Sequence, residues 1–325
     1  MKIITTVVGS YPTDDFKPVH FNEKLYDSLG LYDKFIPSVD QSVESFIKYD
    51  VDIICDGQVR GDMVKIFMSK INGIKIIDNT THIVGKITPA SHPITIKDLH
   101  HAFRMAKSKD SKFKLNASLE EIFNHEAKGI KGILTGPTTL IHSSLIDNFY
   151  SCRKNAIYDM AKALTVEAKA IEKAGACAIQ IDEPFISTQQ EDINVSKKAV
   201  EMISESVDIP VILHVCGSLE NVMEDLLQFN VDMLDFEFSG MSQNIDVLRK
   251  YWTSNINKLI GIGCINTRMD SVDDIDVVRK TIQDVVNITK QENIVIDPDC
   301  GMRMLPKDVA MGKLGVIKDI KNNGV

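Results

Sequence analysis

The stretch Ile209-Pro210-Val211-Ile212-Leu213-His214-Val215-Cys216-Gly217 gives the clearest indication of the fold. Its apolar part is short, continuous and rich in β-branched residues, which is typical of a buried strand. Side chains two positions apart on a strand point to the same face. His214 and Cys216 are therefore predicted to project together from the carboxyl end of this strand, as an imidazole beside a thiol.

Seven further short apolar runs have the same character. They cover residues 3–8, 51–55, 132–134, 176–181, 233–236, 259–265 and 294–296. Helical spacing of apolar residues separates several of these runs, at residues 156–173, 218–228 and 273–292. Alternating strands and helices indicate parallel βαβ units, so eight strands predict an α/β fold of the (β/α)8 TIM barrel type. A doubly wound open sheet is the alternative.

The segment between the second and third predicted strands is too long for one crossover helix. We expect an insertion over residues 64–130, within a single barrel domain that spans residues 1–325. Alternating residues on both sides of Asp78-Asn79 predict a β-hairpin in it, and helices are expected in the remainder. Residues 11–37 are expected to form a long loop with short helical stretches above the barrel mouth.

Charge and hydropathy argue against several classes of protein. The net charge is −8 and no Lys/Arg cluster is present, which disfavours a nucleic-acid surface. No apolar run approaches the roughly 18 residues of a membrane span, and the first residues do not resemble a secretory signal. We therefore expect a soluble, cytoplasmic protein that binds neither nucleic acid nor membrane.

The six cysteines are expected to be free thiols, because disulfides are rare in cytosolic chains of this size. Three of them lie in apolar runs and are predicted to be small core residues: Cys55, Cys177 and Cys264. Cys152 is expected at the surface or against a helix. Only Cys216 and Cys300 lie at strand ends next to glycine, so these two are the candidates for chemistry.

Polar residues cluster at the carboxyl ends of the predicted strands. They are Ser10, Asp56, Gln58, Thr135, Asp182, Glu183, His214, Cys216, Glu237, Asn266, Asp297, Asp299 and Cys300. Active sites of TIM barrels lie at this face, where the strand ends converge. A single acidic residue there could be a helix cap, but so large a set predicts a functional site.

Four of these residues form a candidate metal site. His214, Cys216, Glu237 and Cys300 follow the fifth, sixth and eighth predicted strands, so they can reach one ion. Two thiolates and an imidazole favour Zn²⁺ over Mg²⁺ or Ca²⁺, which prefer oxygen ligands. A sulfur-rich set donates charge to the metal, which favours activation of a substrate thiol over activation of water. The expected reaction is alkyl transfer to sulfur; the alternative is that His214 and Cys216 are core residues without a metal.

Seven blocks of sequence, in chain order, carry a family resemblance. They are residues 5–12 (TTVVGSYP), 56–63 (DGQVRGDM), 134–139 (LTGPTT), 179–184 (IQIDEP), 214–216 (HVC), Glu237 and 297–301 (DPDCG). The chain resembles the catalytic C-terminal barrel of cobalamin-independent methionine synthase, in the short archaeal-type form without the N-terminal barrel. The blocks span nearly the whole chain.

The resemblance implies a substrate, a product and a set of binding residues. It implies methyl transfer to the thiol of L-homocysteine to form L-methionine. The family's zinc ligands fall on the four residues chosen above. Homocysteine contacts fall on Val8, Gly9 and Ser10 for the carboxylate and on Asp182 for the ammonium group. Gln58 stands where the family usually has a glutamate, which shifts the ammonium contact toward Asp182.

A second departure concerns the methyl donor. Folate-using members carry a histidine in the loop after the seventh strand, thought to pass a proton to the folate, and Arg268 occupies that place here. Arginine is a poor proton donor at neutral pH. We therefore expect a methylated corrinoid as donor, either methylcobalamin or a corrinoid protein, with 5-methyltetrahydrofolate as second choice.

Two other functions remain open on the sequence. The methylcobalamin:coenzyme M methyltransferases, relatives of uroporphyrinogen decarboxylase, also contain His-x-Cys-Gly, but the blocks at 182–184 and 297–301 and Glu237 argue against them. A non-catalytic zinc-binding protein is the alternative of another class.

Overall fold

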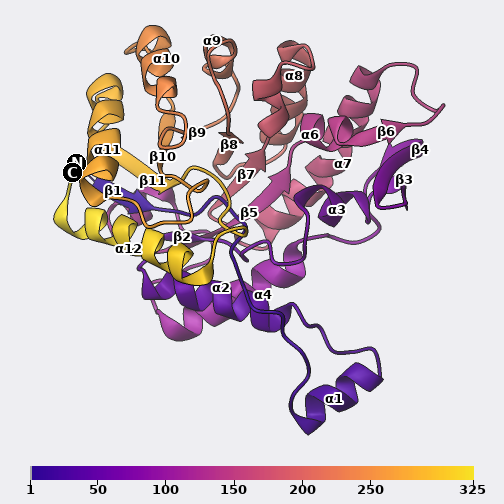
Figure 1. Ribbon diagram of the computed structural model, residues 1–325. Helices are drawn as coiled ribbons and strands as arrows, with labels where there is room; N and C mark the ends of the chain where they lie inside the picture. The colour runs from indigo at the N-terminus through magenta and orange to yellow at the C-terminus, as the bar shows by residue number, and fades with distance from the viewer. Residues whose placement is uncertain (1) are drawn as a thin grey trace.

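One eight-stranded parallel sheet closes into a barrel in the computed structural model, which describes residues 2–325 (Figure 1). The strands lie in the order β1 (Lys2–Thr5), β11 (Asn293–Pro298), β10 (Leu259–Ile265), β9 (Met233–Glu237), β8 (Val211–Val215), β7 (Ala178–Asp182), β5 (Gly129–Thr135) and β2 (Ile53–Ile54). Each overlaps one predicted run. A parallel bridge between Thr6 and Ile53 joins β1 to β2. The predicted (β/α)8 barrel is therefore confirmed, and the open doubly wound sheet is excluded.

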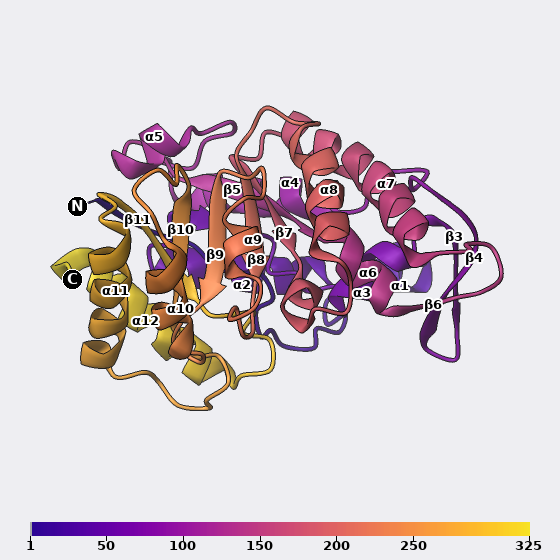
Figure 2. The same cartoon turned by 90° about the horizontal axis from the view of Figure 1, so that it is seen from above.

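Helices cover the outside of the barrel (Figures 1 and 2). They include α2 (Ile36–Lys48), α7 (Arg153–Lys173), α8 (Ile193–Ser204), α10 (Gln243–Tyr251), α11 (Ile275–Thr289) and α12 (Lys307–Asn323). Among them, α7 and α11 match predicted helices. The helix predicted over 218–228 is mostly wrong, because only α9 (Met223–Leu226) is helical there. Ahead of α9, the Val222 and Met223 amides both donate to the Leu219 carbonyl oxygen (3.1 and 3.0 Å), and the Leu219 amide donates to Asn244 Oδ1 on α10 (3.1 Å).

The long segment between β2 and β5 contains the predicted hairpin. Its strands are β3 (Asn72–Ile77) and β4 (Thr80–Thr88), joined by Asp78 and Asn79 with φ of +47° and +66°. Two left-handed residues are the geometry of a type I′ turn. Helices α3 (Met63–Met68), α4 (Ile96–Lys109) and α5 (Leu119–Phe123) make up much of the remainder. A third strand, β6 (Ser144–Ile146), comes from beyond β5 and pairs with β4 after the short helix α6 (Pro137–His142).

The segment before α2 does not cover the barrel mouth as expected. It carries α1 (Phe21–Ser28), which projects away from the barrel (Figure 1). The base of this projection is fastened at the side of the barrel by Asp33, which pairs with Arg60 (2.7 Å) and with Lys97 on α4 (2.6 Å). Helix α1 itself has no buried residue.

Two layers of different polarity fill the barrel. The layer nearest the amino ends of the strands is apolar and includes Ile4, Ile53, Ala178, Ile212, Met233 and Val295, against which Ile122 and Phe123 of α5 pack. One pleat further along the strands, the inward residues are polar and buried: Lys131, Gln180, Asp235 and Asp297. The candidate site lies directly above this polar layer.

The free cysteines are distributed as predicted. Cys55, Cys177 and Cys264 are buried, Cys152 is exposed, and Cys216 and Cys300 have intermediate exposure. Within residues 2–325, no helix combines the length and the apolar character needed to cross a membrane.

Candidate active site

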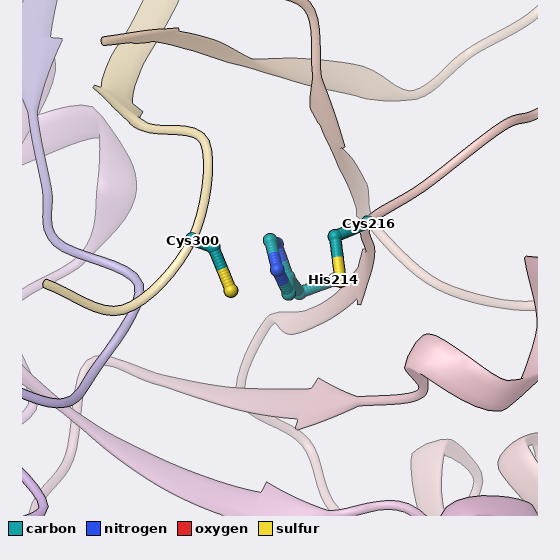
Figure 3. Close-up of side chains that lie close together, drawn as sticks. All are labelled: His214, Cys216 and Cys300. Carbon is teal, nitrogen blue, oxygen red and sulfur yellow. The ribbon is translucent and has the colours of Figure 1, made fainter. Parts of the chain in front are cut away.

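Three of the predicted metal ligands converge at the carboxyl ends of β8 and β11. His214 lies on β8, Cys216 follows it, and Cys300 follows β11. Their potential ligand atoms all lie within 4.8 Å of one another. In Figure 3, Cys300 approaches the His214 ring from one side, while His214 and Cys216 come from the chain segment of β8 on the other. We name this group the His-Cys-Cys cluster.

A buried ion pair fixes the His214 ring. Its Nδ1 lies 2.7 Å from Asp235 Oδ2, and both residues are almost fully buried. Burial lowers the pKa of His214, but the Asp235 carboxylate outweighs burial and raises it well above its usual value. The other ring nitrogen, Nε2, is buried and has no hydrogen-bond partner among the described residues. A carboxylate on Nδ1 with an unpaired Nε2 is the arrangement of a metal-binding histidine.

The two thiols share one negative charge. Interaction with the Cys216 thiol lowers the pKa of Cys300 to about 4, and the reciprocal interaction raises the pKa of Cys216. One sulfur of the pair is therefore a thiolate at neutral pH. Thiolate is the form of cysteine that binds metals. An imidazole nitrogen and two sulfurs, one already ionised, form a donor set that fits Zn²⁺.

Glu237, the fourth predicted ligand, lies outside the His-Cys-Cys cluster. Its Oε2 accepts hydrogen bonds from the Gly217 amide and from Arg268 Nη2, both at 2.9 Å. The other oxygen, Oε1, lies 2.8 Å from the same Nη2 but without hydrogen-bond geometry. The structure therefore brings three of the four predicted ligands together and places Glu237 in an ion pair.

The predicted substrate residues lie together beside Cys300. A Cβ added to Gly9 would be 2.5 Å from Gln58 Oε1, so the Gln58 side chain lies directly against Gly9. A Cβ added to Gly301 would be 2.2 Å from Ser10 Oγ, which places the Ser10 hydroxyl next to the residue after Cys300. Glycine at both positions keeps this part of the mouth open.

Gln180 links the remaining two substrate residues. Its Nε2 donates to the Val8 carbonyl oxygen (2.7 Å) and to Asp182 Oδ1 (2.6 Å), and its Oε1 accepts from Lys131 Nζ (2.5 Å). Burial raises the pKa of Asp182 to about 6. Lys131 and Gln180 were not among the predicted site residues. A lysine inside the apolar run 129–134 was the available signal, because a charge in a buried strand needs a partner.

Neighbouring acidic residues have structural roles. Glu183 accepts from the Thr138 and Thr139 amides at the start of α6 (2.9 and 2.8 Å), and burial raises its pKa to about 7. Asp299 accepts from three successive backbone amides, those of residues 238–240, and burial raises its pKa to about 8. Asp235 was also missed, although it lies two residues before Glu237 and so shares its strand face.

The comparisons with known proteins agree with one another. Residues 3–323 match the family model described as cobalamin-independent synthase, catalytic domain. A methionine synthase of Methanothermobacter thermautotrophicus is 43% identical over 96% of this chain and 97% of its own length, and one of Methanocaldococcus jannaschii is 39% identical over 96% of each. A solved B12-independent methionine synthase from Shewanella sp. W3-18-1, in complex with selenomethionine, shares the fold with a TM-score of 0.78 at 20% identity, covering 99% of this chain and 98% of that one. The chain belongs to the family of cobalamin-independent methionine synthase catalytic domains and is a methyltransferase.

Proposed function

We propose that the protein transfers a methyl group to the sulfur of L-homocysteine and releases L-methionine. The observation that carries this proposal is the His-Cys-Cys cluster beside a group of polar residues that includes a carboxylate, Asp182, and a hydroxyl donor, Ser10. A thiol substrate with an amino-acid end needs a thiophilic centre and, a few ångströms away, partners for ammonium and carboxylate. The relatives named methionine synthase support the same reaction.

We propose that His214, Cys216 and Cys300 hold Zn²⁺, with Glu237 as a further ligand in part of the cycle. Bound there, Zn²⁺ would keep a substrate thiol ionised at neutral pH, where a free thiol with a pKa of about 8.5 is mostly protonated. With a metal bound, Asp235 would keep the remaining proton of His214 on Nδ1 and so leave the Nε2 lone pair to the metal. This role requires no movement of the ring.

The amino-acid end of the substrate is assigned to the polar residues beside Cys300. Asp182 would pair with the ammonium group, aided by the amide oxygen of Gln58. The Ser10 hydroxyl, with backbone amides at Val8 and Gly9, would donate to the carboxylate. Gln180, whose own side chain is held by Lys131, donates to Asp182 and so restrains the orientation of its carboxylate.

The donor expected from the sequence is not supported by the family. The matching family is described as cobalamin-independent, which favours a methyl pterin of the 5-methyltetrahydrofolate type over a corrinoid. We therefore propose the pterin as first candidate. A methylated corrinoid remains the second candidate because of one observation: Arg268, which carries a permanent positive charge, lies over the site and cannot supply a proton to a pterin nitrogen.

A turnover assay tests the reaction and the donor together. The zinc-loaded protein is incubated with L-homocysteine and either 5-methyltetrahydrofolate or methylcobalamin, and methionine is measured by mass spectrometry. We expect methionine from wild type and from the exposed-thiol control Cys152→Ala, and none from Cys300→Ala. Product from methylcobalamin alone would reverse the donor order. Preferred methylation of coenzyme M over homocysteine, or no methylation at all, would refute the proposed function.

A further inference from the structure

Arg268 reaches into the site from a loop with a fixed backbone. The loop follows β10, and its first residue, Asn266, donates its amide to Asp273 Oδ1 (2.8 Å) and its side chain accepts from the Arg268 amide (2.9 Å). Lys313, which is fully buried, donates to Asp273 Oδ2 (2.7 Å) and to the Asn266 carbonyl oxygen (2.8 Å). This buried ion pair sets the position from which the Arg268 side chain starts.

The Arg268 side chain itself is far less constrained than the carboxylate that it contacts. It is 58% exposed, whereas the side chain of Glu237 is 2% exposed. Space for Glu237 in this position depends on Gly240, because a Cβ there would lie 2.5 Å from Glu237 Oε1. A buried carboxylate is thus held at the edge of the site by a surface arginine and by the Gly217 amide.

Arg268 and the proposed metal ion can therefore compete for the Glu237 carboxylate. Glu237 accepts from the amide directly after Cys216, so it is adjacent to the His-Cys-Cys cluster, yet its charge is neutralised by Arg268. A buried carboxylate without a cation partner is strongly disfavoured, so loss of one partner drives it toward the other.

We propose that Arg268 is a positioning residue that holds Glu237 away from the metal and so keeps a coordination position open for the substrate thiol. This inference rests on the proposed metal site. With a metal bound and no thiol present, Glu237 would be shared between Arg268 and the metal, and Arg268 would hold the carboxylate once a thiol occupied the metal.

A double-mutant cycle on metal binding tests this role without reference to turnover. Zn²⁺ affinity is measured by chelator competition for wild type, Arg268→Gln, Glu237→Gln and the double variant. We expect Arg268→Gln to raise Zn²⁺ affinity about tenfold, because Glu237 then binds the metal permanently. In the Glu237→Gln background the same change should have an effect of about twofold or less, which accounts for the lost charge alone.

Thiol binding provides the second readout. In the Co²⁺-substituted proteins, the absorption change on adding 2-mercaptoethanol reports a new metal–sulfur bond without involving the amino-acid pocket. We expect Arg268→Gln to weaken this thiol about tenfold, by the reciprocity of coupled equilibria, and Arg268→Lys to restore part of the affinity. Equal effects of Arg268→Gln in both backgrounds would overturn the inference and leave the metal site intact. Failure of the wild type to bind Zn²⁺ would refute the proposed metal site, and the inference with it.

Discussion

Replacing Asp235 by asparagine removes the negative charge next to the His214 ring and keeps the shape of the side chain. The two side chains are almost fully buried and meet at 2.7 Å. Unit charges about 4 Å apart at an effective dielectric of about 20 attract by about 4 kcal/mol. Desolvation and the amide's remaining ability to accept from Nδ1–H reduce the net loss. We expect Zn²⁺ affinity to fall about 10- to 100-fold, or about 1.4–2.7 kcal/mol.

The matched control lies in the same polar layer. Burial raises the pKa of Asp297 well above its usual value, which disfavours the charged form of this side chain. Asp297→Asn therefore keeps the shape and should change the charge less than Asp235→Asn does, so Zn²⁺ affinity should stay within about twofold of wild type. Chelator competition at neutral pH measures both variants. Equal losses in the two, or no loss in Asp235→Asn, would refute the reasoning.

The metal-free protein offers an independent check on the same pair. The pKa of His214 is raised in the folded state, so the ion pair stabilises the fold fully below the unfolded value of about 6.5. That contribution is lost as pH rises through the higher folded value. The deficit of Asp235→Asn in unfolding free energy should therefore be largest near pH 6 and shrink as the solution becomes alkaline. Denaturant unfolding at several pH values measures this deficit. A deficit that grew as pH rose would contradict the prediction.

Three further predictions concern carboxylates elsewhere in the barrel. Burial raises the pKa of Asp182 to about 6, so homocysteine should bind more tightly as pH rises from about 5 to about 7. Asp182→Asn should weaken homocysteine binding about 100-fold, as measured by calorimetry. An unaltered pH profile would argue against the ammonium contact. Glu183→Ala leaves two buried amides without an acceptor, so urea unfolding should show a loss of about 2–4 kcal/mol with Zn²⁺ affinity nearly unchanged, and a loss below about 1 kcal/mol would remove its capping role. Partial burial raises the pKa of Asp50, but Lys128 and Lys321 outweigh it and lower the pKa to about 2. Because Asp50 is partly exposed, Asp50→Asn should cost only about 1 kcal/mol above pH 5 after allowance for solvent screening, and this cost should vanish as pH falls through about 4 to about 2; a deficit that persists at pH 2 would point to packing instead.

The barrel could be predicted because buried parallel strands leave a direct trace in the sequence. Each strand is covered on both faces, so it reads as a short continuous apolar run, and all eight were found. The hairpin turn at Asp78-Asn79 was also recognisable, because both residue types tolerate positive φ. The short length of the helix after β8 was not recognisable. The Leu219 amide there donates to Asn244 on α10, and such a contact between distant residues leaves no local pattern.

Part of the candidate site could likewise be predicted from the sequence and part could not. The pairing of His214 with Cys216 follows from the two-residue period of a strand, and the structure places Cys300 with them. The position of Glu237 could not be read from that period, because its side chain is held by Arg268, 31 residues away. Strand alternation predicts which face a side chain occupies, but not which of two cations it pairs with.

The polar layer explains why a barrel can hold this site rigidly. His214 rests on Asp235, and Asp182 rests on Gln180 and Lys131, so each functional side chain has a buried polar support one step further into the barrel. Such supports are costly to bury, and hydrogen bonds offset only part of the cost, since Asp235 Oδ1 has no partner among the described residues. The apolar layer beneath them, sealed by α5, supplies the hydrophobic burial that offsets this cost. Stability therefore depends on the amino ends of the strands and chemistry on their carboxyl ends, and substitutions in the middle layer should affect both.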